Sequence, residues 1–438
     1  YYPSSRRYRN PLYLRIEDVP GAENLAGELD GLARAGRALN QVRRIDRDRV
    51  WQLKADALAR CYTQAPPDPD FDAFVHDGGE SLREFATYCA LAEIHGNGWR
   101  TWPEELQRPD SPAVADAGAR LRERVGFHSW LQWLLDRQLA AAGDLAVVSD
   151  LAVGFDPGGA DAWAWQDLLA LDMRVGAPPD EFNAQGQDWG LPPFVPWRLR
   201  DCGYRPFIET VRSALRHAGG LRVDHVMGLF RLFWIPAAGG SGTGTYVRYP
   251  ASELLDILAL ESHRAGAFVV GEDLGTVEDS VRRELADRAV LSYRLLWFED
   301  RPPEEFPHQA LAAVTTHDLP TIAGMWTGAD LADQQEIGLA PSEEGQESLR
   351  RRLARAAGVG DGAAVDEVTE GAYRALARCP SRLLAATLDD ALGVRERPNM
   401  PGTTDQWPNW SLALPLPLED IEVDPRVAAV TRALGARS

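Results

Sequence analysis

The sequence of 438 residues is almost without lysine, because Lys54 is the single lysine among 46 lysines and arginines. Lys54 stands in the run Trp51–Ala55, which has the apolar spacing of an ordinary helix. Enzymes that work through a Schiff base need a lysine amine in a buried pocket. The scarcity of lysine therefore argues against that class of chemistry.

Cysteine is also scarce, and its four positions are far apart, with no C-x-x-C pair: Cys61, Cys89, Cys202 and Cys379. This pattern is typical of reduced thiols in the cytoplasm and does not indicate a disulfide framework or a zinc site. The chain also lacks a run of about eighteen apolar residues and a signal-peptide pattern. We therefore expect a cytoplasmic protein without a membrane partner.

Acidic residues outnumber basic ones, so the net charge is -19 and the sequence pI is about 4.9. Such a balance argues against a nucleic acid or an anionic membrane as partner, whereas a neutral oligosaccharide is compatible with it. The hydrophobic fraction of 45% allows a large core. A chain of this length suits one elaborated α/β barrel or two to three ordinary domains.

Three acidic clusters are the most informative feature that is present. Asp224 follows Leu221-Arg222-Val223, Glu272 follows Val270-Gly271, and Asp318 follows Thr315-Thr316-His317. Each carboxylate ends a short apolar or β-branched run and precedes a turn. The three are spaced by about 46 to 48 residues, roughly one strand-helix unit with a generous loop. Carboxylates at the ends of successive parallel strands are expected to converge on one face of a barrel.

The surrounding pattern predicts alternating strands and helices in most of the chain, which is typical of a parallel α/β sheet. We expect a first strand over Leu12–Ile16 and further strands near Leu145–Ser149, Leu221–Asp224, Phe268–Gly271, Leu291–Trp297 and Ala312–Thr316. Helices are predicted between them at Pro206–Ala218, Ala251–Ala265 and Val277–Ala286.

Two segments depart from this alternation. Residues from about 21 to 119 have helical spacing broken by proline-rich stretches, and they predict a helical insertion, which a long helix over Ala115–Ala142 follows. Residues 176–197 are rich in Gly, Pro, Asn and Gln and predict a long loop. Long loops in compact enzymes commonly form lids or binding loops, so we assign this loop to the active site.

The carboxylates suit the cleavage of a glycosidic bond. This reaction needs one carboxylic acid to protonate the leaving oxygen and a second carboxylate on the other side of the sugar. A third can hold sugar hydroxyls as the ring flattens. Arg222, two residues before Asp224, would point to the same side of the strand and keep Asp224 ionised. Asp273, beside Glu272, would raise the pKa of the acid.

Each of these residues also has a purely structural interpretation. An aspartate at a strand end is often a helix N-cap, as Asp318 before Leu319-Pro320 could be. Most of the fourteen tryptophans are expected in the core, although Trp189, Trp407 and Trp410 stand in polar loops that suit sugar stacking.

Three other functions stay open on these residues. The chain could be a hydrolase of the α-amylase clan, or it could serve only as a glucan-binding module. A metal-dependent hydrolase could use His225, Glu272, Asp273, His317 and Asp318, although no H-x-H or H-E-x-x-H spacing is present.

Several motifs, taken in order, resemble the 4-α-glucanotransferase family, also called amylomaltases or disproportionating enzymes. The resemblance runs from the first residue to about Leu434 and includes Tyr1-Tyr2-Pro3-Ser4-Ser5-Arg6-Arg7, Asn10-Pro11-Leu12, Asp150-Leu151-Ala152, Gly186-Gln187-Asp188-Trp189-Gly190, Arg222-Val223-Asp224-His225, Gly271-Glu272-Asp273-Leu274-Gly275, Thr316-His317-Asp318 and Asn399-Met400-Pro401-Gly402-Thr403. Each motif is weak alone, and the ordered set is specific.

The resemblance implies a (β/α)8 barrel of TIM type with inserted helical subdomains. It implies retaining transfer of α-1,4-glucan segments from a maltooligosaccharide or glucan donor to a glucose or maltooligosaccharide acceptor, without metal or cofactor. Asp224 matches the nucleophile, Glu272 the acid/base and Asp318 the transition-state carboxylate. The matching substrate contacts are Arg222, His225, His317, Asp150, Asp273, Gln187, Trp189 and, for donor stacking, Tyr1.

Members of this family normally begin upstream of Tyr1 with the first barrel strands. The resemblance therefore predicts that residues 1–438 form one catalytic barrel whose first strands are missing from this chain. A barrel opened in this way would have two unpaired edges, which are costly. On this interpretation the isolated chain would be poorly stable or inactive.

Overall fold

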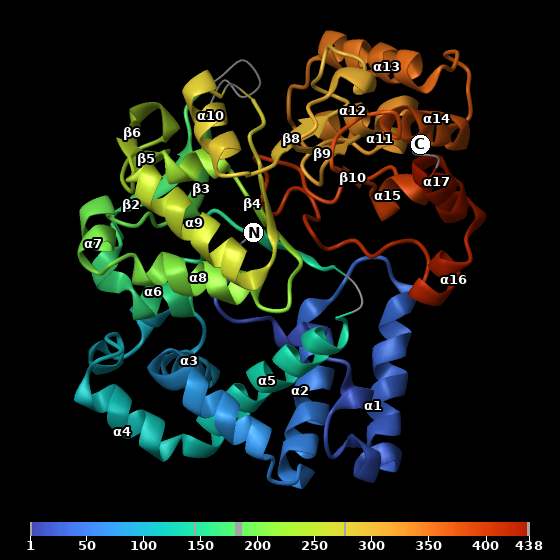
Figure 1. Ribbon diagram of the computed structural model, residues 1–438. Helices are drawn as coiled ribbons and strands as arrows, with labels where there is room; N and C mark the ends of the chain where they lie inside the picture. The colour runs from blue at the N-terminus through green and yellow to red at the C-terminus, as the bar shows by residue number, and fades with distance from the viewer. Residues whose placement is uncertain (1, 144–145, 180–185, 276, 436–438) are drawn as a thin grey trace. The chain divides into compact units, whose positions relative to one another are not determined.

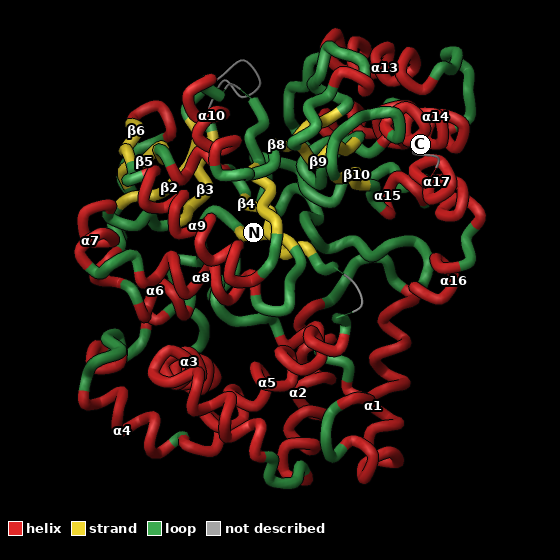
Figure 2. The backbone as a smooth tube through the Cα atoms, in the orientation of Figure 1, coloured by secondary structure: helices red, strands yellow, loops and turns green. Residues whose placement is uncertain are grey.

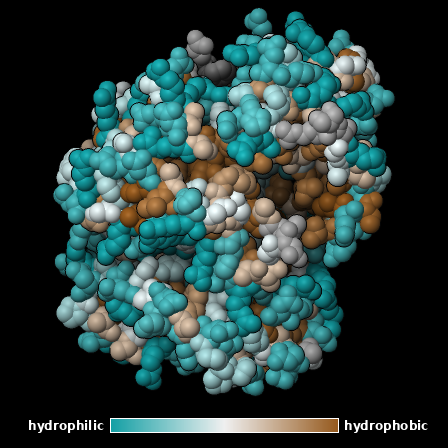
Figure 3. Space-filling model, viewed as in Figure 1, coloured by the Kyte–Doolittle hydropathy of each residue, from teal (hydrophilic) through white to brown (hydrophobic). Residues whose placement is uncertain are grey.

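The computed structural model describes residues 2–143, 146–179, 186–275 and 277–435. The chain divides into two compact units, which we describe separately. Unit 1 comprises Tyr1–Gly36 and Asp48–Glu272, and unit 2 comprises Arg37–Arg47 and Asp273–Ser438. None of the described helices combines the length and the apolarity that a membrane span requires. Hydrophilic residues cover most of the face shown in Figure 3, as the acidic composition leads one to expect.

Helices make up the first part of unit 1 (Figure 1). They are α1 Ala26–Ala38, α2 Arg47–Gln64, α3 Pro69–His95, α4 Pro112–Arg120 and α5 Arg122–Ala141. The aromatic side chains of α5, among them Phe127, Trp130 and Trp133, are buried against α2 and the residues before α1. Within the described part of residues 21–119, the structure contains helices and an isolated bridge at Arg44 but no longer strand, as the helical spacing predicts.

A three-stranded parallel sheet in unit 1 holds the segments that precede the acidic clusters. Its strands are β1 Val148–Leu151, β4 Gly220–Val223 and β7 Phe268–Gly271, in the order β1-β4-β7. Helices α8 Arg205–Leu215 and α9 Ala251–Ala265 connect them. Leu221, Val223 and Val270 are buried, which is why β4 and β7 read as apolar runs in the sequence.

A second sheet of unit 1 is antiparallel and was not predicted. It has the order β3-β2-β5-β6, from β2 Met173–Ala177, β3 Gln187–Leu191, β5 Arg231–Pro236 and β6 Thr245–Arg248. The short helix α6 Ala160–Ala164 precedes β2 in the sequence, and the short helix α7 Pro196–Asp201 follows β3. The predicted loop 176–197 therefore contains strand β3 and the end of β2, while residues 180–185 lie outside the described part.

Unit 2 contains a parallel sheet of its own, with helices around it (Figures 1 and 2). The strands are β8 Ser292–Leu295, β9 Ala310–Ala313 and β10 Leu383–Ala385, with β9 in the middle. The helices are α10 Asp279–Asp287, α11 Ile322–Thr327, α12 Ala329–Glu336, α13 Glu343–Ala357, α14 Val365–Leu376, α15 Leu388–Ala391, α16 Leu418–Glu422 and α17 Pro425–Gly435. Trp297, Val314 and Tyr373 lie in its core.

Two predictions about elements are wrong. Residues 12–16 form helical turns over Pro11–Tyr13 and Ile16–Asp18, because Asn10 accepts the Leu12 N–H and Pro11 occupies the first helical position. The predicted helix Ala115–Ala142 is interrupted at Leu121, which has non-helical angles between α4 and α5.

The single lysine fastens the first of these turns to α2. Nζ of Lys54 donates to the carbonyl oxygens of Leu12 and Leu14, at 2.6 and 2.8 Å. Partial burial lowers the pKa of Lys54. Two main-chain acceptors give this amine a structural role.

Candidate active site

The pairing register of unit 1 places Asp150 beside Arg222. These residues are direct partners across β1 and β4, so their side chains emerge on the same side of the sheet. The Arg222 guanidinium donates to Oδ1 of Asp150 at 2.6 Å and to Oδ1 of Asp224 at 2.8 Å. The predicted contact between Arg222 and Asp224 is present, and one cation bridges two carboxylates.

Glu272 is fastened to the turn that follows Asp224. Its main-chain N–H donates to the Val223 carbonyl at 3.0 Å, and its own carbonyl accepts from the Val226 N–H at 3.1 Å. The side-chain Oε2 accepts from the His225 N–H at 3.0 Å. Glu272 and Asp224 thus lie at the ends of adjacent strands, with the His225 backbone as a direct link.

His225 itself is held in an unusual backbone conformation. Its φ of 45° and ψ of 62° lie in the left-handed region, which a β-carbon disfavours. Burial, aided by nearby Arg231, lowers the pKa of His225 to about 4. The imidazole is therefore neutral at physiological pH and can both donate and accept hydrogen bonds to a sugar.

Strand β3 brings Trp189 against this histidine. The two rings meet edge to face with centroids 5.2 Å apart. The indole N–H donates to Gln187 Oε1 at 3.0 Å, and the Tyr2 hydroxyl donates to the Trp189 carbonyl. Gly190, with φ of 69°, leaves the space that Tyr2 occupies. Trp189 also packs on the core of the antiparallel sheet, so it contributes to structure as well.

Unit 2 holds the third carboxylate, Asp318, just after β9. Its Oδ1 accepts from the side-chain amide of Asn399 at 2.6 Å, and its Oδ2 lies 3.2 Å from Nε2 of His317. The His317 ring packs on Trp410 with centroids 4.8 Å apart. The Asp318 side chain remains 42% exposed, so it keeps an open side for a ligand.

A buried ion pair supports the main chain at Asp318. Arg397 forms two hydrogen bonds of 2.6 Å with Asp330 on α12, and the two side chains are 8% and 1% exposed. The same guanidinium donates to the Asp318 carbonyl at 3.2 Å. Arg397 and Asn399 had no role in the sequence analysis, although Asn399 lies in one of the motifs of the family.

Asp273, which follows Glu272, is only 2% exposed, and both of its carboxylate oxygens accept hydrogen bonds. Its carboxylate accepts from Arg282 at 2.9 Å, from the Tyr293 N–H at 2.8 Å and from the Ser292 hydroxyl at 3.1 Å. These bonds attach it to α10 and the start of β8. Asp273 therefore holds α10 and β8 in place next to Glu272. Its role as a substrate contact stays a prediction.

The predicted residues fall into two groups. Unit 1 brings together Asp150, Arg222, Asp224, His225, Glu272, Gln187 and Trp189, whereas unit 2 brings together His317 and Asp318. Tyr1 lies outside the described residues. Among the described residues, no group of three or more His, Cys, Asp or Glu side chains is placed to hold a metal ion. The arrangement offers carboxylates, a neutral imidazole and aromatic rings, which is the chemistry of a sugar site.

Sequence comparisons agree on one family. The model of the 4-alpha-glucanotransferase family matches residues 1–417. The 4-alpha-glucanotransferase of Mycobacterium tuberculosis is 45% identical, over 100% of this chain and 66% of that protein. The one from Haemophilus influenzae is 32% identical, over 95% of this chain and 68% of that protein. The chain thus spans about two thirds of the length of these relatives.

Structural comparisons give the same result. The crystal structure of amylomaltase from Corynebacterium glutamicum matches with a TM-score of 0.88 and 36% identity, over 100% of this chain and 67% of that one. The amylomaltase from Streptococcus agalactiae, solved in complex with acarbose, matches with a TM-score of 0.81 at 18% identity, over 99% of this chain and 87% of that one. The predicted fold class, an α/β barrel of TIM type, is confirmed. Because the family model covers nearly the whole chain and both relatives carry the same name, the chain belongs to the 4-alpha-glucanotransferase family.

Proposed function

We propose that this protein transfers α-1,4-glucan segments between maltooligosaccharides, with retention of the anomeric configuration. The observation that carries the proposal is the link between Asp224 and Glu272 at adjacent strand ends. Arg222 favours the charged form of Asp224, and the His225 N–H orients the carboxyl of Glu272. A retaining reaction requires this combination of an ionised nucleophile and a second carboxyl as acid.

In the first step, an Asp224 oxygen attacks the anomeric carbon and forms a glycosyl ester. The bond from that carbon to the glycosidic oxygen breaks, and the proton of Glu272 passes to this oxygen, which departs as the 4-hydroxyl of the leaving sugar. Positive charge develops on the sugar ring during this step. We assign its stabilisation to Asp318, whose Oδ1 is oriented by Asn399.

In the second step, Glu272 accepts the proton of an incoming sugar 4-hydroxyl. That oxygen bonds to the anomeric carbon, and the ester bond to Asp224 breaks. Transfer exceeds hydrolysis only where an acceptor sugar displaces water. We assign this task to residues 176–197 and in particular to Trp189, which lies against His225.

The substrates and the location follow from the same proposal. Donor and acceptor are neutral glucans, with which the net charge of -19 is compatible. We place the reaction in the cytoplasm, because all four cysteines are free thiols.

Incubation with maltotriose tests the activity. We expect chromatography to show glucose together with a ladder of longer maltooligosaccharides. Asp224→Asn should abolish both, whereas Asp110→Asn, at an exposed position without a role in the proposed reaction, should leave the ladder in place. A folded protein that yields only glucose and maltose would be a hydrolase, and a folded protein without any product would contradict the proposal.

A further inference from the structure

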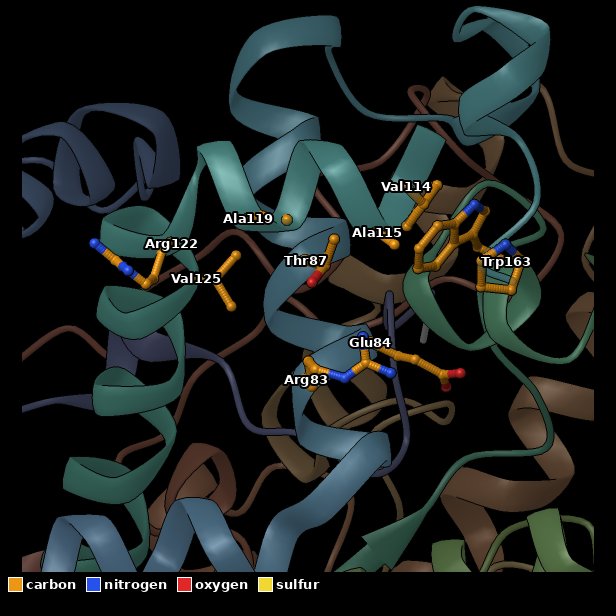
Figure 4. A pocket seen from close by; sticks show the side chains of 11 residues that line it. Arg83, Glu84, Thr87, Val114, Ala115, Ala119, Arg122, Val125 and Trp163 are labelled. Atoms are coloured by element: carbon orange, nitrogen blue, oxygen red, sulfur yellow. The ribbon is translucent and has the colours of Figure 1, made fainter. Parts of the chain in front are cut away.

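A pocket lies in the helical part of unit 1, and it shares no lining residue with the groups around Asp224 and Glu272. Its volume is about 270 Å³. Figure 4 shows Arg83, Glu84 and Thr87 on α3, Ala119 on α4 and Arg122 at the start of α5 around it, with Trp163 of α6 at one end. Four elements thus build one concave surface, to which the proposed reaction assigns no role.

Glu84 is the unusual group in this pocket. It is half-buried, and no hydrogen bond or ion pair reaches its carboxylate from the described residues. Burial raises the pKa of Glu84, while Arg7, Arg83 and Arg205 act against that rise. An unpartnered carboxylate in a concave site costs free energy, and a ligand with hydrogen-bond donors would remove that cost.

The remaining lining residues restrict the chemistry of such a ligand. Arg83 and Arg122 are exposed at the rim and disfavour a cation, whereas Glu84, together with Glu80 nearby, disfavours an anion. The Thr87 hydroxyl can donate and accept. Val114, Ala115, Ala119 and Val125 provide an apolar wall for a C–H face. A neutral ring with several hydroxyl groups could form hydrogen bonds with the polar lining and place its C–H face on the apolar wall. The volume of the pocket suits one pyranose unit.

We propose that this pocket binds one neutral hexopyranose unit, the end of an α-glucan chain, through Glu84, Thr87 and the two arginines. The identity of the sugar as a glucan end rests on the proposed function, whereas the preference for a neutral polyhydroxylated ring does not. Vicinal sugar hydroxyls would donate to both Glu84 oxygens and accept from Arg83 and Arg122. The site would hold long glucans at a second point on the protein.

Calorimetric titration with maltose tests the pocket, in the full chain carrying Asp224→Asn so that no turnover occurs. We expect two binding events in this background. Glu84→Gln should weaken one of them at least tenfold, and Ala119→Phe, at an exposed position of the lining, should remove it by filling the space. Asp77→Asn, at an exposed position of α3 outside the lining, is the control and should retain both events.

Activity separates this inference from the proposed function. With Asp224 intact, Glu84→Gln should leave maltotriose disproportionation unchanged and should slow transfer from long amylose. Equal maltose binding by Glu84→Gln, Ala119→Phe and Asp77→Asn would overturn the pocket assignment. Glu84-dependent maltose binding in a protein that does not disproportionate maltotriose would support the pocket and reject the proposed reaction.

Discussion

Arg222 is the cation that connects two carboxylates of the candidate site. Its guanidinium joins Asp150 on β1 to Asp224 at the end of β4. The planar fork of arginine can serve two carboxylates at once, and lysine offers one point charge in its place. The position of Asp224 therefore depends on the shape of its cation as well as on the charge.

We predict that Arg222→Lys lowers kcat on maltotriose by about 100-fold, because a shift of about 1 Å in a reacting group costs that much. The charge is kept, so the loss reports geometry. Arg264→Lys, an exposed position on α9, serves as the control and should change kcat by less than about twofold. An Arg222→Lys enzyme with normal kcat would show that the bridge does not position Asp224.

His225 should make stability fall in mild acid. Its pKa is about 4 in the folded protein against the ordinary 6.5, so between these values the unfolded chain binds a proton that the folded chain does not. The stability present above pH 6.5 is therefore lost as pH falls toward 4, by on the order of 2 kcal/mol. Asparagine tolerates the left-handed backbone. In the variant His225→Asn, the free energy of unfolding, measured with urea, should therefore change less between pH 6.5 and pH 4. His76→Asn, at an exposed site, should leave this pH dependence unchanged. The same pH dependence in the wild type and in both variants would contradict the assignment to His225.

Spacing and chain direction were enough to predict Asp224 and Glu272 at the ends of neighbouring strands and the contact between Arg222 and Asp224. They did not predict Asn399 or Arg397, because these residues reach Asp318 from about 80 positions away and from an irregular segment. The buried environment of Asp273 also has no local signature. Its partners Arg282, Ser292 and Tyr293 are ordinary residues until the fold places them around it.

At the scale of elements, the ion pair of Arg397 and Asp330 connects α12 to the segment at Asp318. Loss of one partner of a buried pair leaves an uncompensated charge. We predict that Arg397→Met lowers the free energy of unfolding by about 3 kcal/mol and also reduces kcat, since the bond to the Asp318 carbonyl disappears. Arg378→Met, which breaks an exposed pair with Glu304, should cost less than about 1 kcal/mol. Equal urea midpoints for the two variants would contradict the prediction.

Asp390 joins three helices, and no cation among the described residues pairs with its carboxyl. Its carboxyl accepts from the Ile322 N–H of α11 at 2.7 Å and from the Tyr373 hydroxyl of α14 at 2.8 Å, while α15 carries it. Burial, as the largest cause, raises the pKa of Asp390 to about 6 from the ordinary 3.8. Between these values the folded state holds a proton that the unfolded state releases.

The contribution of Asp390 is therefore fully present below pH 3.8 and lost as pH rises through about 6. We predict that Asp390→Asn gains on the order of 2 kcal/mol relative to wild type between pH 4 and pH 7. Urea unfolding at several pH values measures this gain. Asp110→Asn, at an exposed position, is the control, and a gain independent of pH would reject the titration of Asp390 as its cause.

Elements with a strong local pattern could be predicted, and those that depend on distant partners could not. Strand β7 and helix α9 begin and end where the sequence predicts, because an apolar run and an amphipathic period define them. The antiparallel sheet was missed even though β5 is rich in aromatic and β-branched residues. Its neighbour β2 pairs with a segment about 60 residues away, and β3 contains Gly and Asp, which local propensity assigns to loops.

At the scale of the whole molecule, a short piece of the N-terminal half belongs to unit 2. Residues 37–47 lie in that unit, although residues on both sides of them lie in unit 1. The Ile45 N–H donates to the Ser411 carbonyl, and the Ala413 N–H donates to the Arg43 carbonyl, both at 2.7 Å. Arg47 also donates to the Trp410 carbonyl, next to the tryptophan ring that packs on His317.

The local stability of residues 410–413 should therefore depend on residues 43–47, which lie more than 360 positions earlier in the sequence. We predict that Ile45→Pro, which removes one N–H donor, speeds hydrogen exchange at the Ala413 amide at least tenfold, because each bond of such a short pairing supports the other. Ile45→Ala keeps the donor and shortens the side chain, so it separates main-chain pairing from packing. Exchange at Leu221, in the sheet of unit 1, should stay unchanged in both variants. Faster exchange in Ile45→Ala as large as in Ile45→Pro would assign the effect to side-chain packing instead.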